Sequence, residues 1–221
     1  MKILKITLIA VISSVLLVLP STAKELRIGV AAGFTNVNAD GTETMKDSGK
    51  ENTTEASENA IIPSIFAEFA ADNGFGLGIE HVPGSADINS KTRSRSDDDE
   101  ETTGDNTAAA EVDGLTSIYL IKSFENGFFL KVGKTSTTVN TKEVLATGSV
   151  YKNADVDGSL IGLGFTNTAD NGVFVRVSGE YTDYDNIKLT SQTADAVTGT
   201  TNTIDASVDT VAFKLSVGRA F

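Results

Sequence analysis

The chain has 221 residues, with 30 acidic and 18 basic side chains and a formal net charge of −12 at neutral pH. Nucleic acid is not expected as a partner, because its binding requires lysine and arginine to neutralise phosphates. The sequence contains no cysteine, which excludes disulfides and thiolate sites and leaves hydrogen bonding and packing to stabilise the fold.

The first residues have the composition of a secretory signal peptide. Two lysines precede an apolar run over residues 6–19, and Ser21-Thr22-Ala23 then supplies the small residues that a signal peptidase reads. We therefore predict cleavage after Ala23. The alternative, an N-terminal membrane anchor, is less favoured because the run is shorter than the roughly 20 residues of a spanning helix. Cleavage would leave 221 − 23 = 198 residues and, with two lysines lost, a net charge of −14.

Three short segments carry the same turn chemistry: Asp72-Asn73-Gly74, Glu125-Asn126-Gly127 and Asp170-Asn171-Gly172. Asn-Gly is a strong hairpin signal and favours a type I′ turn, in which both central residues have positive φ. Segments with a period of two lie on either side of each turn. They predict strands over residues 61–72 with 75–84, 113–124 with 128–139, and 158–168 with 173–184, and the segments 25–37 and 208–221 bring the total to eight.

Four long polar stretches separate these strands, at residues 38–60, 85–112, 140–157 and 185–207. Their Thr, Asn, Asp, Ser and Gly content predicts loops. Short turns that alternate with long loops are typical of an up-and-down barrel, with the turns facing the periplasm and the loops facing outside. After residue 23 no apolar stretch is long enough for a membrane helix, so any span must be made of strands. The sequence predicts an all-β, eight-stranded antiparallel transmembrane β-barrel.

Alternation along the strands indicates which face meets lipid. In the last strand apolar residues alternate with small or charged ones, and a face so rich in small residues cannot cover a water-facing exterior. We therefore expect the apolar face to point outward and the other to fill the narrow lumen. The same pattern predicts as lipid-facing Leu26, Ile28, Val30, Ala32, Phe34, Phe75, Leu77, Ile79, Phe128, Leu130, Val132, Ile161, Leu163, Phe165, Val173, Val175, Val177, Val211, Phe213, Leu215 and Val217.

The strand around residues 118–121 is apolar on both faces, and its register rests on Lys122, which favours even positions facing inward. Six phenylalanines lie beside the short turns and predict an inner interfacial girdle, with ordinary core packing as the alternative. These are Phe69, Phe75, Phe124, Phe128, Phe129 and Phe174.

Six charged residues alternate out of phase with the lipid-facing ones and are predicted to lie inside the barrel: Glu68, Glu80, Lys131, Arg176, Glu180 and Lys214. Their heights predict a lower layer of Glu68, Lys131 and Arg176 and an upper layer of the other three. Buried charges must be paired, and an eight-stranded barrel is only wide enough for side chains. We predict an ion-pair plug, with Glu180 and Lys214 as its first pair. The alternative is that Lys131 and Arg176 extend to the periplasmic interface.

No catalytic, cofactor or metal site is expected. His81 and Ser85 share a strand face, but the strand rise separates them by about 13 Å, too far for a direct hydrogen bond. The acidic run 97–101 lacks the spaced ligands and fixed glycine of a calcium loop, so we interpret it as a solvated loop that the basic segment 91–95 can pair with.

The C-terminal strand ends in Phe221, and over residues 24–221 the chain resembles the small outer-membrane β-barrels of the OmpA/OmpX type, without their peptidoglycan-binding domain. The resemblance implies that Phe213, Leu215, Val217 and Phe221 form a signal for the barrel-assembly machinery. Arg219 departs from the usual apolar residue near the end. The resemblance also implies a Gram-negative outer membrane, with its lipid and lipopolysaccharide as partners.

Two functions from different classes remain open at this point. One is a non-enzymatic barrel that presents its four polar segments at the cell surface, and the other is a narrow diffusion channel for small solutes. We favour the first, because the plugged lumen argues against conduction. A lipid-modifying enzyme, an activity found among proteins of the resembled type, is less favoured because His81 has no suitably placed nucleophile.

Overall fold

The computed structural model describes residues 23–221 except 47–48, 96–103, 143, 146–147 and 195–198. Ten β-strands make up the fold: β1 (Ala23–Thr44), β2 (Glu51–Ala71), β3 (Phe75–His81), β4 (Ser85–Arg95), β5 (Gly104–Ser123), β6 (Phe128–Thr141), β7 (Ala154–Thr168), β8 (Val173–Tyr184), β9 (Ile187–Thr190) and β10 (Thr203–Ala220). Nowhere in the described residues is there a helix with the length and hydropathy to cross a bilayer. Residues 1–22 of the predicted signal peptide lie outside them and Ala23 begins β1, so cleavage after Ala23 stays a prediction.

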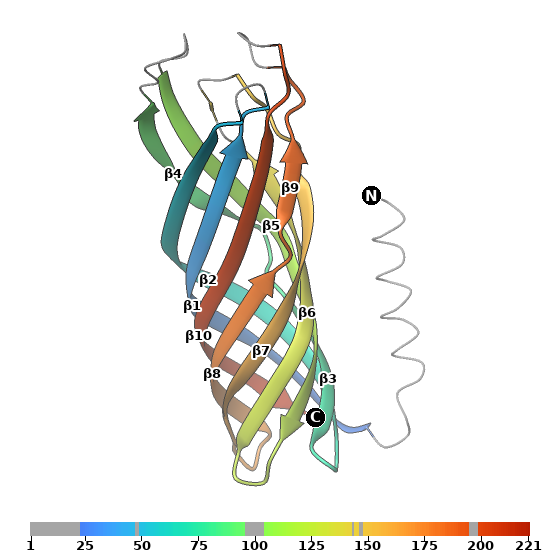
Figure 1. Cartoon of the computed structure of the whole chain (residues 1–221). Coiled ribbons are helices and arrows are strands. Elements are labelled where there is room, and N and C mark those ends of the chain that lie inside the picture. Colours follow the sequence, from blue (N-terminus) through green and yellow to red (C-terminus); the bar gives the residue numbers. More distant parts are fainter. Residues whose placement is uncertain (1–22, 47–48, 96–103, 143, 146–147, 195–198) are drawn as a thin grey trace.

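The strands form a closed barrel (Figure 1). All pairings are antiparallel, and β1 pairs with both β2 and β10, so the first and last strands join. β3 and β4 follow one another along one position and both pair with β5, while β8 and β9 do the same on β10. The ten strands therefore occupy eight positions, which confirms the predicted eight-stranded antiparallel barrel.

The three short turns are in the predicted places, but they are not of type I′. In the described residues only glycines have positive φ, among them Gly74, Gly127 and Gly172 with φ of 79°, 85° and 81°. The amide of each donates to the carbonyl three residues earlier, as in Gly127 to Phe124 at 2.9 Å. This is the arrangement of a type I turn followed by a left-handed glycine. The preceding asparagine has a different role, because its Oδ1 accepts from the amide two residues later at 3.1 Å in all three turns.

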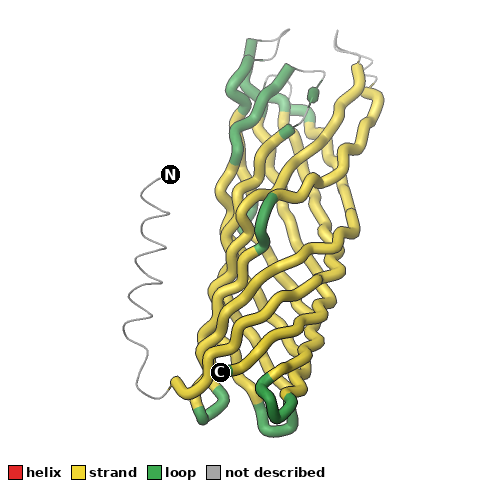
Figure 2. The backbone as a smooth tube through the Cα atoms, turned by 180° about the vertical axis from the view of Figure 1, so that it is seen from behind, coloured by secondary structure: helices red, strands yellow, loops and turns green. Residues whose placement is uncertain are grey.

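The four polar stretches were predicted as loops, but the structure shows strand over most of 38–60 and 85–112 and over smaller parts of 140–157 and 185–207. β1 and β2 continue to Thr44 and from Glu51, and β1 stays in register with β10 as far as Thr44 opposite Thr203. Figure 2 shows strand over most of the barrel wall, with loop segments mainly toward its two ends. In residues 38–44 and 51–60 polar side chains occur at both alternate positions, so the alternation used to find strands is absent there.

The predicted lipid-facing residues are confirmed on β1, β6, β7, β8 and β10, where large apolar side chains are exposed, such as Phe34 at 57% and Phe213 at 61%. On β5 the predicted register was wrong by one residue. Tyr119 and Ile121 are buried, and Leu120 between them is 57% exposed. Lys122 misled the prediction, because it lies on the outer face at the turn end, where its Nζ donates to the carbonyl of Asn73.

The predicted phenylalanine girdle was partly wrong. Phe75 and Phe124 are exposed on the outer face, on either side of the Lys122 ammonium, which lies 4.5 and 5.7 Å from their ring centres. Phe129 and Phe174, by contrast, are each only 1% exposed and lie in the lumen. Proximity to a turn sets the height of a residue, but its parity along the strand sets the face.

Candidate functional site: the charged lumen

The lower half of the lumen is crossed by a glutamate–arginine pair. Glu68 on β2 is fully buried, and both its oxygens are bound by Arg176 on β8. Nη1 lies 2.6 Å from Oε1 and Nη2 lies 2.8 Å from Oε2. Tyr119 donates its hydroxyl to Oε1 at 2.8 Å. A bidentate pair of this kind satisfies the two charges against each other and fixes their geometry.

Aromatic rings surround the Arg176 guanidinium. Its Cζ lies 4.9 Å from the ring centre of Phe129, 5.4 Å from Phe66 and 5.5 Å from Phe174. Its remaining Nε donates to the Thr166 hydroxyl at 3.0 Å. Ring faces attract a cation when water is excluded, so these contacts add to the pairing with the carboxylate.

Four lumen rings each lie opposite a glycine of a neighbouring strand, and in each case a Cβ on that glycine would collide with the ring. The absence of a side chain on one strand therefore makes room for an aromatic ring on the next. The pairs are Phe66 with Gly29, Tyr119 with Gly78, Phe129 with Gly164 and Phe174 with Gly218.

The upper layer is a closed ring of two glutamates and two lysines. Lys131 on β6 donates to Glu80 on β3 at 2.9 Å and to Glu180 on β8 at 3.0 Å. Lys214 on β10 contacts the same two carboxylates at 2.6 and 2.9 Å. Ser64 adds a hydrogen bond to Glu80 at 2.7 Å. Each charge therefore has two partners of opposite sign.

The two layers are electrically balanced and nearly fill the barrel. Three acidic and three basic side chains carry no net charge together. The Lys131 ammonium lies 4.0 Å from the Tyr119 ring centre and so links the upper layer to the lower. The cavity left among these side chains measures about 10 Å³, enough for about one water molecule.

All six residues predicted for the lumen face inward, and Glu180 contacts Lys214 as predicted. The predicted layers were partly wrong, because Lys131 belongs to the upper ring rather than to the Glu68 layer. Its long side chain reaches upward, and Arg176 is held by Glu68 instead of extending to the periplasmic interface. The sequence reasoning missed Tyr119 because of the register error on β5.

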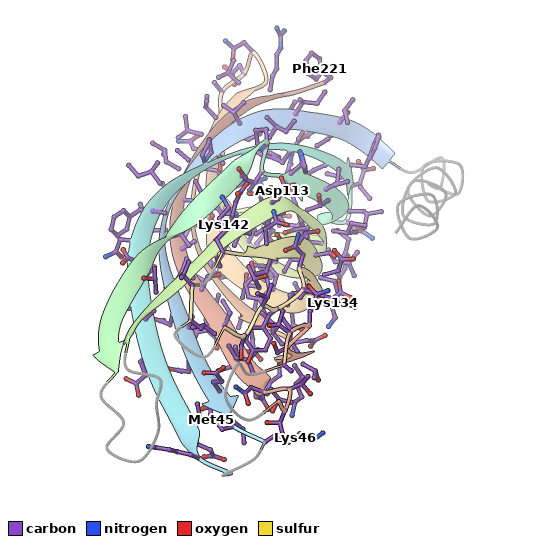
Figure 3. The ribbon with its side chains drawn as sticks, turned by 90° about the horizontal axis from the view of Figure 1, so that it is seen from above. Met45, Lys46, Asp113, Lys134, Lys142 and Phe221 are labelled. Atoms are coloured by element: carbon purple, nitrogen blue, oxygen red, sulfur yellow. The ribbon has the colours of Figure 1, made fainter. Side chains whose placement is uncertain are left out.

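A second buried polar cluster lies at the opposite end of the barrel from the short turns, in a part that had been predicted as loops. Tyr151 donates to Glu43 at 3.0 Å, and Asn202 donates to Ser149 at 3.2 Å. All four side chains are buried. Figure 3 looks down on this end, where Met45 and Lys46 are labelled.

On the outer part of β5, Glu111 is linked to the end of the neighbouring strand. Hydrogen bonds from Lys142 and then from Ser85 hold the pKa of the Glu111 carboxyl below its ordinary value. The Glu111 side chain is partly exposed, and its carboxylate contacts Lys142 directly. The pair ties the rim of β5 to the end of β6.

The other candidate residues form no reactive arrangement among the described residues. His81 is on the outer face, with Nδ1 2.9 Å from the Thr116 hydroxyl, and Ser85 is exposed. No group of three possible metal ligands occurs in the described part of the chain. The acidic run 97–101 lies outside the described residues.

The C-terminal residue is held by its backbone, while its side chain is exposed. Leu26 and Phe221 exchange two backbone hydrogen bonds, at 3.1 and 2.9 Å. The Phe221 ring is exposed and lies beside Arg219, whose guanidinium carbon is 5.3 Å from the ring centre. Recognition of Phe213, Leu215, Val217 and Phe221 by an assembly machinery stays a prediction.

Solved structures with the same architecture show which fold this is. The outer membrane protein OprG from Pseudomonas aeruginosa superposes with a TM-score of 0.61 at 14% identity, covering 90% of this chain and 97% of that one. The outer membrane protein AlkL, solved in lipid bilayers, gives 0.55 at 10% identity and covers 89% and 90%. This chain has the fold of the outer-membrane β-barrels.

The likeness of this outer-membrane barrel to known proteins is one of fold alone. The outer membrane protease OmpT from Escherichia coli also superposes, with a TM-score of 0.51 at 8% identity over 90% of this chain and 98% of that one. No family model matches the sequence. No curated protein matches it either. The exposed apolar band, which only lipid can cover, agrees with location in an outer membrane.

Proposed function

We propose that the protein is a non-enzymatic outer-membrane barrel that does not conduct solutes and presents the upper, polar part of its wall at the cell surface. The observation that carries the proposal is the filled lumen. Glu80, Glu180, Lys131 and Lys214 bridge four strands in one ring, and Glu68 with Arg176 closes the lumen below it. A route for solutes would have to break these buried pairs.

The polar segments are consistent with a role at the cell surface, but many of their residues belong to strands and not to free loops. The strands continue beyond the apolar band, so much of the exposed part is a β-structured wall. A backbone ordered by pairing loses less conformational entropy on binding than a flexible loop does. This wall is therefore suited to contact a partner without first folding.

Planar-bilayer conductance of the purified, refolded protein tests the proposal. We expect wild type to be almost silent and Lys214→Ala to conduct measurably more, because the substitution removes one corner of the upper ring. Lys188→Ala is the matched control, since Lys188 also pairs with an acid on its neighbour, Asp205 at 2.8 Å, but on the exposed surface. It should stay silent.

Steady, large conductance of wild type that Lys214→Ala leaves unchanged would overturn the plug. That result would favour the narrow diffusion channel. Heat-modifiable migration on gels should be checked for all three proteins, so that conductance is compared only among folded barrels.

A further inference from the structure

Among the described residues, the upper part of one edge of β2 pairs with no strand. β1 pairs with β2 along its whole length, whereas β3 pairs only with Ile65 to Ala70. β4 continues upward from β3, but its partner is β5 and not β2. Among the described residues, the backbone from Glu51 to Ser64 therefore has a strand partner on one side only. We call this free side the β2 edge.

Two prolines mark the point where the strands part. Pro63 lies on β2 just above its last pair with β3, and Pro83 lies between β3 and β4. Proline has no amide to donate to a neighbouring strand. Gly84 follows with a φ of 86°, which a residue with a side chain rarely adopts. The separation is therefore encoded in the sequence at both strands.

The β2 edge is long for an exposed edge. It spans 64 − 51 + 1 = 14 residues, whereas proteins ordinarily shorten, twist or cover such edges to prevent unwanted pairing. Figure 1 shows β2 and β4 rising together toward the upper end of the barrel. An open row of backbone donors and acceptors at this end is a template for a further strand.

The side chains of the β2 edge indicate what kind of strand would fit. Glu51, Glu55 and Glu58 are its charged residues, and residues 51–64 include no lysine or arginine. At the lower end Ile61 is 74% exposed, the highest value among the large apolar side chains described. Like charges opposite one another destabilise a strand pair. The β2 of a second copy would bring acid against acid, whereas a basic segment would bring opposite charges together.

We propose that the β2 edge binds an extended, basic segment of a protein partner by strand addition. The inference rests on the proposed function, because it requires this end of the barrel to face outside. In an antiparallel pair the partner places an apolar side chain opposite Ile61. Lysine or arginine then stands opposite Glu55 and Glu51, on the same face of the new strand.

The probe is a synthetic eleven-residue peptide with isoleucine first, lysine at the seventh and eleventh places, and threonine or serine elsewhere. These places stand opposite Ile61, Glu55 and Glu51. The protein is refolded into phosphatidylcholine vesicles, and hydrogen exchange is followed with and without the peptide. We expect slower exchange within residues 51–62 and unchanged exchange along β7.

Two variants separate strand pairing from simple charge attraction. Glu51→Lys/Glu55→Lys should weaken peptide binding by about tenfold, because two favourable cross-strand pairs become repulsive. Asp157→Lys, an exposed acid on β7, changes the surface charge away from the edge and should leave binding nearly unchanged. A peptide N-methylated at alternate amides keeps its charge but should not bind.

The proposal is overturned if the peptide does not bind, if the N-methylated peptide binds equally well, or if protection appears outside the β2 edge. Equal loss of binding in Asp157→Lys would also overturn it, because attraction would then be non-specific. Conductance measured on the same preparation keeps the two proposals apart. A conducting wild type contradicts the plug, whereas a silent protein that ignores the peptide contradicts only the strand addition.

Discussion

On β10 the outward side chains change character within a few residues. Phe213 and Val211 are exposed and apolar, whereas Ser207 and Asp205 face the same way further up and are polar. The inner face carries Lys214 in the lower part and uncharged residues above it. The lower barrel separates lipid from a charged interior, and the upper barrel has water outside. Both parts are built by antiparallel backbone pairing, so they differ only in the medium that each face contacts.

The comparison also applies to the ion pairs that the two regions contain. Lys214–Glu180 and Lys188–Asp205 have almost the same length, 2.9 and 2.8 Å, and both lysines contact a carboxylate on a neighbouring strand or on the far wall. The side chains of the first pair are 19% and 6% exposed, and those of the second 71% and 48%. We expect burial, and not the length of the ion pair, to decide how much each pair contributes to the free energy of unfolding.

The largest effect is expected at the bottom of the lumen. Glu68→Ala leaves the Arg176 guanidinium buried without its carboxylate, which should lower the free energy of unfolding by about 4 kcal/mol. Urea unfolding of the refolded protein in vesicles measures this. Replacing both residues by methionine should recover most of the loss, since no buried charge then remains unpaired. A single variant as stable as wild type would show that water reaches this pair.

The two lysines of β9 and β10 test the comparison directly. Lys214→Ala should cost roughly 3 kcal/mol, because it leaves Glu80 and Glu180 with one cation between them. Lys188→Ala should cost less than about 1 kcal/mol, as exposed pairs generally do. The same urea experiment applies to both. Equal costs would mean that the upper wall is as shielded from solvent as the lumen.

A smaller effect is expected where glycine makes room for a lumen ring. Gly78→Ala places a Cβ against the Tyr119 ring and displaces the hydroxyl that binds Glu68, with an expected cost of about 2 kcal/mol. Gly179→Ala is the control, because no atom lies within 4 Å of a Cβ built there. Near-ultraviolet circular dichroism reports the tyrosine environment alongside stability. An unchanged signal in Gly78→Ala would show that the ring is not fixed by this contact.

The places where prediction failed share a physical cause. In the upper barrel both faces can be polar, so residues 38–44 and 51–60 carry no periodicity, although residues 38–44 pair with strands on both sides and residues 51–60 pair with β1. On β5 the run 118–121 is apolar on both faces because Tyr119 and Ile121 pack inside the barrel. The alternation of polar and apolar residues reflects a difference in polarity between the two sides of a strand. Where both sides have the same polarity, the sequence shows no alternation.

The sequence by itself determined the strand positions around the three Asn-Gly turns, the lipid-facing residues and the six inward charges, because lipid on one side and a narrow lumen on the other impose a strict period of two. Only the tertiary structure decided which charges meet. Lys131 joins the upper ring instead of the Glu68 layer, and Arg176 is enclosed by Phe66, Phe129 and Phe174. Such partners come from different strands across the lumen, and their distances depend on strand stagger and side-chain reach, which no local pattern records.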